Sequence, residues 1–251
     1  MKDRILETLE RIEWEWDVDV LYACESGSRA WGFASPDSDY DVRFVYAGRL
    51  DRYLTVDRVR DVIELPIVDD LDINGWDVKK ALALLRNSNP TLLEWLHSPV
   101  VYRACDGFID ALRELATQAV NPRALVHHYL SMARSNWRRD QGGSRISAKR
   151  YLYVLRPLLA VQWVIEHGSV PPVAFDALMA GVVREEGVWD GLNALLVTKS
   201  ASGEQSQMLR HPELDRYINQ NLWALAERVP EAVEKPPVAP FNDLLRVSVG
   251  G

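Results

Sequence analysis

The start of the chain carries hydrophobic patterns of two different periods. Ile5, Leu6, Leu9 and Ile12 recur at helical spacing, which predicts an amphipathic helix over residues 1–17. A run of strand-forming residues follows at 18–24 and leads into turn-forming residues. The chain is therefore expected to begin with a helix that is followed at once by a strand.

A second strand is predicted at residues 40–46, where polar and apolar side chains alternate. Alternation places Asp41 and Arg43 on one face of that strand. Further strands are predicted at 61–67 and 70–74. The strand-forming patterns are thus confined to roughly the first third of the chain.

The remainder of the sequence predicts mainly helices. After Asp106 one helical pattern follows another, with breaks expected near 141–143 and 202–203. Strands gathered in one segment and helices in the next are typical of the α+β class. We therefore expect a domain with a small mixed β-sheet over residues 1–105, followed by an all-α helical domain over residues 106–251.

Composition and charge narrow the classes of function. The chain is 47% hydrophobic and 26% charged, as is ordinary for a soluble globular protein. Its formal net charge of -7 excludes a global basic field for nucleic acid. The N-terminus is charged throughout, and no apolar run approaches the ~18 residues that a membrane span needs, so a cytoplasmic location is expected. Cys24 and Cys105 are expected to be reduced and buried, since their spacing suggests no metal site.

The stretch with the most chemical information begins at Gly27 and Ser28 and ends at Asp39 and Asp41. Two carboxylates two positions apart on a strand project to one face, where they repel each other unless a cation is present. Mg²⁺ prefers such oxygen ligands and is commonly shared with substrate phosphates. Gly27 lets the backbone approach a triphosphate, Ser28 can hydrogen-bond a phosphate oxygen, and Arg29 is near enough to add charge. Either motif alone is common on solvated turns and strand ends, so their combination carries the interpretation.

The order Gly-Ser, ten intervening residues and Asp-x-Asp between two strands resembles the signature of the DNA polymerase beta-like nucleotidyltransferase superfamily. The longer string over residues 25–43 resembles one branch, the RNA-repair-pathway (RlaP-type) family. Similar segments continue at 72–77, 88–96 and 149–158, so the resemblance spans most of the chain. It implies a polymerase beta-like palm in the first domain, a substrate-binding helical domain, and two Mg²⁺ ions for which Mn²⁺ can substitute.

The superfamily resemblance also implies a third metal carboxylate on a later strand. Asp72 is the first candidate, because it lies between two apolar residues of a predicted strand. Asp77 is the second candidate, although its position suits a helix cap, and Glu64 on the neighbouring strand is the third. The predicted catalytic and metal-binding set is therefore Asp39, Asp41 and Asp72.

A basic cluster occurs in the helical half of this acidic chain. Basic residues between Arg134 and Arg156 are spaced by three and four positions, which places several of them on one helix face. The cluster is predicted to face a triphosphate or an RNA end, and the alternative is a solvated basic face. Lys199 is a further candidate phosphate contact. The predicted nucleotide-binding residues are Gly27, Ser28, Arg29, Lys149, Arg150, Tyr153 and Arg156.

These features predict transfer of a nucleoside monophosphate from an NTP, with ATP or CTP expected, to an acceptor hydroxyl with release of pyrophosphate. One Mg²⁺ on Asp39 and Asp41 would bind the triphosphate, and a second shared with Asp72 would lower the pKa of the acceptor hydroxyl. The resemblance points to an RNA acceptor, and the net charge of -7 favours a short end or a tRNA-like hairpin. Two alternatives stay open: adenylylation of a small molecule or a protein side chain, and a catalytically silent nucleotide-binding protein.

Overall fold

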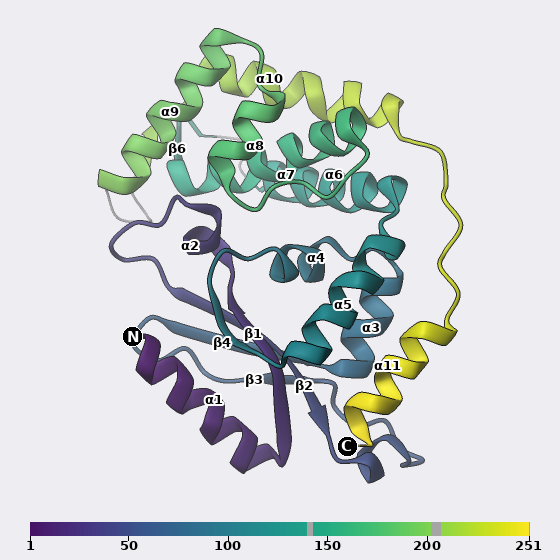
Figure 1. Cartoon of the computed structure of the whole chain (residues 1–251). Helices are drawn as coiled ribbons and strands as arrows, with labels where there is room; N and C mark the ends of the chain where they lie inside the picture. The colour runs from purple at the N-terminus through teal and green to yellow at the C-terminus, as the bar shows by residue number, and fades with distance from the viewer. Residues whose placement is uncertain (140–142, 202–206, 251) are drawn as a thin grey trace. The chain divides into compact units, whose positions relative to one another are not determined.

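The structure is a computed structural model that describes residues 1–139, 143–201 and 207–250. These residues form two compact units, which are treated separately below (Figure 1). The first unit comprises residues 1–30, 39–119 and 235–251, and the second comprises residues 31–38 and 120–234. The helix breaks predicted at 141–142 and 202–203 lie outside the described residues.

The first unit is built on a five-stranded sheet with the order β3-β4-β2-β1-β5. Strands β2 and β4 run parallel, and the other neighbouring pairs are antiparallel, so the sheet is mixed as predicted. Strand β5 had no clear sequence signal, because it is four residues long and no residue in it is buried. The strands are β1 (Val18–Glu25), β2 (Tyr40–Gly48), β3 (Val62–Glu64), β4 (Leu71–Asp77) and β5 (Val101–Ala104).

Helix α1 (Lys2–Trp16) covers one face of this sheet. Its Ile5, Leu9 and Ile12 are fully buried in a core cluster that includes Phe44 and Ile73 of the sheet. Each such burial contributes ~1.5–3 kcal/mol relative to an exposed side chain. Because strand residues alternate between faces, the residues next to Phe44 and Ile73 in sequence project to the opposite face of the sheet.

The other helices of the first unit lie between its strands in sequence, directly after β5, or after the second unit. Helix α4 begins with the Asn89 side chain accepting a hydrogen bond from the Leu92 N–H at 3.1 Å and with Pro90 at the first helical position. These elements are α2 (Gly27–Trp31), η1 (Leu50–Tyr53), α3 (Val78–Arg86), α4 (Pro90–Leu96), α5 (Asp106–Ala119) and α11 (Ala239–Val249).

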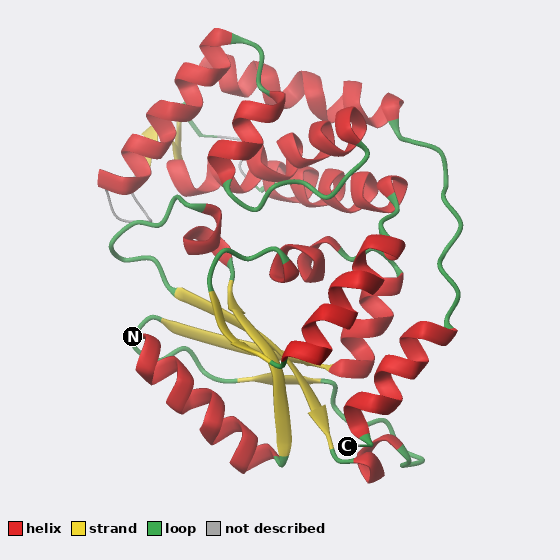
Figure 2. Ribbon diagram, in the orientation of Figure 1, coloured by secondary structure: helices red, strands yellow, loops and turns green. Residues whose placement is uncertain are grey.

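The second unit is mainly helical (Figure 2). Helices α6 and α7 pack along each other, and α7 also contacts α8, α9 and α10. An antiparallel ribbon of two short strands joins this helical unit, and hydrophobic periodicity did not reveal it because each strand has three residues. The elements are α6 (Pro122–Arg138), β6 (Arg145–Ser147), α7 (Ala148–His167), α8 (Phe175–Val182), α9 (Glu186–Ala201), β7 (Gln207–Leu209), α10 (Pro212–Ala224) and η2 (Leu225–Arg228).

Residues 31–38 belong to the second unit, although they lie inside the Gly-Ser and Asp-x-Asp motif. Phe33 meets Phe175 of α8 edge-on, with ring centres 5.4 Å apart. The Arg156 guanidinium of α7 lies 4.2 Å from the centre of the Trp31 ring. Aromatic and cation–π contacts therefore fix this motif segment on the helical unit.

The boundaries of the two compact units differ from the single domain boundary that the sequence predicts at residue 105. Helix α5 groups with the first unit, and α11 returns to it after the whole second unit. Both helices pack against α3. The sequence pattern of a helix shows that it has an apolar face, but it does not show which element covers that face. The roles of the two parts as catalytic and substrate-binding domains stay a prediction.

Two expectations from composition can be compared with the structure. Cys24 is buried as expected, whereas Cys105 is exposed, so the expectation for Cys105 was wrong. Cys105 directly precedes α5 and lies outside the buried part of the sheet. Over the described ranges, every helix is too short or too polar to cross a bilayer.

Candidate active site

Asp41 and Asp72 lie beside each other on two neighbouring strands of the first unit. They are Cα partners in the parallel register of β2 and β4. One terminal nitrogen of Arg43 lies 2.7 Å from Asp41 Oδ1 and 2.7 Å from Asp72 Oδ2. The side chains of Arg43, Asp41 and Asp72 are 18%, 22% and 27% exposed, so the cluster is largely shielded but still reaches solvent. The sheet thus brings Asp72 to Asp41.

The Arg43 guanidinium is also anchored to the backbone of both strands. Its other terminal nitrogen donates to the carbonyl oxygens of Val42 and Asp72, each at 3.1 Å. Two carboxylates this close repel each other, and a fixed guanidinium offsets that repulsion. Sequence reasoning placed Arg43 on the correct face and gave it no role. An arginine two positions after Asp41 on the same strand face was the available signal.

Gly27 is packed directly against Asp41. A Cβ added to Gly27 would lie 1.9 Å from Asp41 Oδ2, and Gly27 has a φ of +58°. Glycine tolerates this left-handed conformation, and only a residue without Cβ leaves room for the carboxylate. The backbone N–H of Ser26 donates to the carbonyl of Asp41 at 2.8 Å. Ser28 follows in α2 and is buried. The Gly-Ser turn and Asp41 are therefore one structural unit.

Asp39 lies one residue before β2, which begins at Tyr40. Its backbone carbonyl accepts a hydrogen bond from Nε of Arg29 at 3.1 Å. The Arg29 guanidinium lies 3.7 Å from the centre of the Tyr40 ring. Arg29 therefore holds the segment that enters β2. The prediction that Asp39 and Asp41 both lie within the strand holds only for Asp41, because the regular pairing of β2 starts after Asp39.

Glu25 is a buried carboxylate that sequence reasoning did not select. It ends β1, and its Oε1 accepts a hydrogen bond from the backbone N–H of Asp41 at 2.8 Å. Its Oε2 accepts a hydrogen bond from the Tyr102 hydroxyl, and its backbone carbonyl accepts one from Ser98 Oγ at 2.6 Å. Burial raises the pKa of Glu25. An acid that ends an apolar strand two residues before Gly27 was the signal that could have identified it.

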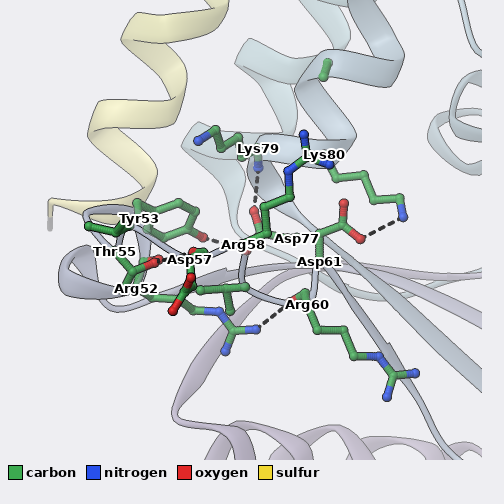
Figure 3. Close-up of a pocket in the computed structure, with 13 residues that line it drawn as sticks. Arg52, Tyr53, Thr55, Asp57, Arg58, Arg60, Asp61, Asp77, Lys79 and Lys80 are labelled. Carbon is green, nitrogen blue, oxygen red and sulfur yellow. Dashed lines mark hydrogen bonds and ion pairs between the residues drawn. The ribbon is translucent and has the colours of Figure 1, made fainter.

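Asp77, the second candidate for a third carboxylate, has a different set of partners (Figure 3). Its Oδ1 accepts a hydrogen bond from the backbone N–H of Lys79 at 2.8 Å, which makes Asp77 the N-cap of α3. Its Oδ2 accepts one from the Tyr53 hydroxyl at 2.9 Å. Burial raises the pKa of Asp77. Asp77 pairs with Tyr46 near the far end of β2, away from Asp41. Glu64 on β3 pairs with Asn74 and is exposed.

Asp77 also lines a cavity of about 460 Å³ that contains several basic residues. Its charged side chains do not converge on one point (Figure 3). Lys80 reaches Asp61 at 3.0 Å, whereas Lys79 and Arg60 extend away from each other. Paired and diverging charges do not form a binding centre, so this cavity is not the candidate site. The charged residues that line it are Arg52, Asp57, Arg58, Arg60, Asp61, Asp77, Lys79 and Lys80.

In the second unit, Lys199 of α9 is buried against the motif segment. Its Nζ donates to Ser35 Oγ at 2.6 Å and to Ser38 Oγ at 3.3 Å. Ser38 Oγ also accepts a hydrogen bond from the backbone N–H of Ser35 at 3.0 Å. Lys199 is only 1% exposed. It therefore holds the segment that leads into Asp39, rather than standing at the surface as a phosphate contact.

The other predicted nucleotide-binding residues of the second unit lie on α7. Arg156 is buried under Trp31. The ring of Tyr153 meets Trp31 edge-on at 5.5 Å between centres, and Lys149 Nζ lies 5.7 Å from the centre of the Tyr153 ring. The backbone N–H of Arg150 donates to Ser147 Oγ at 3.2 Å, within the N-cap of the helix. Helix α7 thus gathers cationic and aromatic side chains around Trp31, and their contact with a nucleotide stays a prediction.

The carboxylate pair fits a divalent cation that is shared with a substrate. Within residues 1–139, 143–201 and 207–250, no group of three or more His, Cys, Asp or Glu side chains forms a ready-made metal centre. Mg²⁺ is usually bound by one or two carboxylates together with waters and substrate phosphates. The oxygens of Asp41 and Asp72, which the strand register places side by side, suit that mode of binding.

The mixed sheet, the Gly-Ser turn and the paired carboxylates are the features of a polymerase beta-like nucleotidyltransferase. The chain belongs to the RNA repair pathway DNA polymerase beta family (RlaP), whose model matches residues 1–247. The family resemblance read from the sequence is thereby confirmed.

The chain is similar to a protein of Bacillus subtilis and to a solved structure from Exiguobacterium sibiricum. The chain is 43% identical to "Uncharacterized protein YcgL" of Bacillus subtilis (strain 168) over 247 residues. This alignment covers 98% of this chain and 95% of that protein. A crystal structure of a nucleotidyltransferase-like protein from Exiguobacterium sibiricum 255-15 aligns over 96% of this chain and 78% of that chain, at 16% identity and a TM-score of 0.30. A similarity that low carries no argument about this protein.

Proposed function

We propose that the protein is a Mg²⁺-dependent nucleotidyltransferase that moves a nucleoside monophosphate from an NTP, ATP or CTP, to a hydroxyl of an RNA end. The observation that carries the proposal is the pairing of Asp41 with Asp72 on parallel strands, with Gly27 packed on Asp41. Membership of the RlaP family supports the same reaction class. A fold alone hosts many functions, so these residues carry the argument.

In this proposal, Asp39, Asp41 and Asp72 hold the metal ions. When bound, Mg²⁺ supplies positive charge that stabilises the triphosphate and lowers the pKa of the acceptor hydroxyl. Gly27 admits the phosphates close to the backbone, and Ser28 hydrogen-bonds a phosphate oxygen. Arg43 keeps the two strand carboxylates in place through one oxygen of each.

The reaction is an in-line displacement at the α-phosphorus. The acceptor oxygen forms a bond to that phosphorus, and the bond from phosphorus to the oxygen that bridges to the β-phosphate breaks. Pyrophosphate leaves with the bonding electron pair, and the hydroxyl proton passes to a neighbouring carboxylate or to water. The protein contributes positioning and electrostatic stabilisation and forms no covalent intermediate.

An RNA acceptor is supported by the family to which the chain belongs. The net charge of -7 disfavours a long nucleic-acid footprint, which needs many phosphate contacts. A short 3′ end or a tRNA-like hairpin therefore fits best. Adenylylation of a small molecule or a protein side chain is the alternative within the same chemistry, and a silent nucleotide-binding protein is the alternative without chemistry.

The test is incubation of the protein with Mg²⁺ and each α-³²P-labelled NTP, with and without total RNA. We expect label on RNA, release of pyrophosphate, and no transfer by Asp39→Ala. Asp19→Ala is the matched control, because the Asp19 side chain is 62% exposed on β1 of the same sheet. Label found on protein or on a small molecule, and not on RNA, would show that the acceptor is that molecule instead of RNA. NTP binding without any transfer would favour the silent alternative.

A further inference from the structure

A groove of about 510 Å³ lies in the second unit, where residues of α6 and α10 meet. Among the described residues, its lining contains two arginines and two tryptophans and no acidic residue, in a chain with a net charge of -7. The lining residues are Arg134, Trp137, Arg138, Asn219, Leu222 and Trp223.

The two tryptophans of the groove differ in their surroundings. Trp137 is 5% exposed, and its indole N–H donates to Asn219 Oδ1 at 2.9 Å, so it belongs to the packed floor. Trp223 is 77% exposed on α10. An indole with this exposure contributes little to folding and leaves a large apolar face available to a partner.

The arginines lie beside the exposed indole. The Arg134 guanidinium carbon lies 5.9 Å from the centre of the Trp223 ring, and its terminal nitrogen donates to the Leu222 carbonyl at 2.9 Å. Arg138, one turn further along α6, is exposed, and its Nε donates to the Arg134 carbonyl at 3.4 Å. Neither arginine forms an ion pair with a carboxylate in the described part of the chain, so their charge remains available.

We propose that this groove binds a single-stranded nucleic-acid segment, with a base stacked on Trp223 and phosphates at Arg134 and Arg138. An exposed aromatic face beside uncompensated guanidinium groups is the combination that binds unpaired nucleic acid. In the part of the chain that the structure describes, the lining carries no acidic side chain, which suits a polyanion. The inference rests on the proposed function in one respect: it makes this strand the acceptor.

The charge of the groove distinguishes it from the cavity in Figure 3. That cavity includes Asp57, Asp61 and Asp77 among its lining residues, and its basic groups point apart.

A duplex would offer phosphates but no free base face for Trp223, so single strands should bind more tightly than duplexes.

Fluorescence anisotropy with labelled single-stranded RNA, in the absence of NTP and Mg²⁺, tests the proposal. Trp223→Ala should weaken binding about 5- to 150-fold, the range that corresponds to loss of one stacked base. Trp223→Phe should recover part of the affinity because it restores a stacking face. Arg138→Gln should lower the slope of log affinity against log salt by about 0.7, as expected for one phosphate contact to a single strand. Trp14→Ala is the control, since Trp14 is 85% exposed on α1.

Equal RNA affinity of Trp223→Ala and Trp14→Ala would overturn the proposal. A self-associated protein that Trp223→Ala converts to monomers, with RNA affinity unchanged, would assign the groove to a second copy of the chain. Parallel titrations with DNA of the same sequence identify which kind of strand is preferred. Asp39→Ala should bind RNA as the wild type does. If the protein binds RNA through Trp223 but shows no transferase activity, the groove is still a nucleic-acid site and the proposed function is wrong.

Discussion

Asp41 and Asp72 lie side by side as register partners on the parallel strands β2 and β4, although they are far apart in the sequence. Arg43 binds one oxygen of each carboxylate at 2.7 Å. This relationship turns two acidic residues into one potential metal site, and it favours Asp72 over Asp77 as the third metal carboxylate.

Gly27→Ala should disrupt the site more than a glycine replacement elsewhere in the motif. Alanine at Gly27 meets both a left-handed backbone and Asp41 Oδ2 at 1.9 Å, so Asp41 must move. At Gly32, with φ +85°, an added Cβ meets no atom within 4 Å, and only the backbone strain of about 1–2 kcal/mol applies. Mn²⁺ affinity and thermal unfolding of both variants compare the two effects. Equal loss of Mn²⁺ affinity in the two variants would show that Gly27 has no special relation to Asp41.

Arg43→Gln should lower stability by roughly 2 kcal/mol, because charge-assisted hydrogen bonds are lost and two carboxylates are left facing each other. Mg²⁺ should then stabilise the variant more than the wild type, since the ion relieves that repulsion. Denaturant unfolding with and without Mg²⁺ measures both effects. Arg49→Gln is the matched control, because the ion pairs of Arg49 with Asp17 and Asp19 are exposed and contribute little. Equal stability and an equal response to Mg²⁺ in the two variants would contradict the proposal that Arg43 offsets the repulsion between the carboxylates.

Lys199→Met should separate activity from stability. Methionine has a similar volume and avoids burial of an ammonium group, so the thermal midpoint should be unchanged or higher. The segment with Ser35 and Ser38 loses its anchor, and displacement of the following Asp39 should reduce transfer about 10- to 100-fold. Lys80→Met should leave transfer unchanged. A parallel fall in midpoint and transfer would indicate that Lys199 serves stability alone.

The cysteines provide a test of burial that does not depend on catalysis. Burial raises the pKa of the Cys24 thiol to about 12, so very little thiolate is present at pH 8 and alkylation is slow. Cys105 is exposed and should react in the folded protein. Mass spectrometry after iodoacetamide treatment should find one modified cysteine at pH 8 to 9, and two in denaturant. Rapid modification of Cys24 in the folded protein would contradict the packing of β1.

Much of the site could be predicted from the sequence because its signals are local. Gly27, Asp39 and Asp41 stand in one short motif, and alternation along β2 orients Asp41 and Arg43. The contact between Arg43 and Asp72 was beyond such reasoning, since it depends on which strands pair and in which register. Nothing in a local pattern states that β4 lies parallel to β2 with Asp72 opposite Asp41.

The long-range supports were missed for the same reason. Lys199 meets Ser35 across more than half of the chain, and Tyr102 reaches Glu25 from β5. Helix α11 joins the first unit after the second unit is complete. Hydrophobic periodicity predicts helices in the second half of the chain, whereas β5 gave no clear signal, and the packing partners come only from the folded chain.

The most direct measurement of the proposed metal site is Mn²⁺ binding, followed by electron paramagnetic resonance, to the wild type, Asp72→Asn and Asp77→Asn. Asp72 is proposed as a metal ligand, whereas Asp77 caps α3, a role that asparagine also fills. We predict that Asp72→Asn weakens Mn²⁺ binding by at least about tenfold, a loss of about 1.4 kcal/mol, and that Asp77→Asn binds as the wild type does. Wild-type affinity in Asp72→Asn, together with weakened binding in Asp77→Asn, would contradict the assignment of Asp72 as the third metal carboxylate.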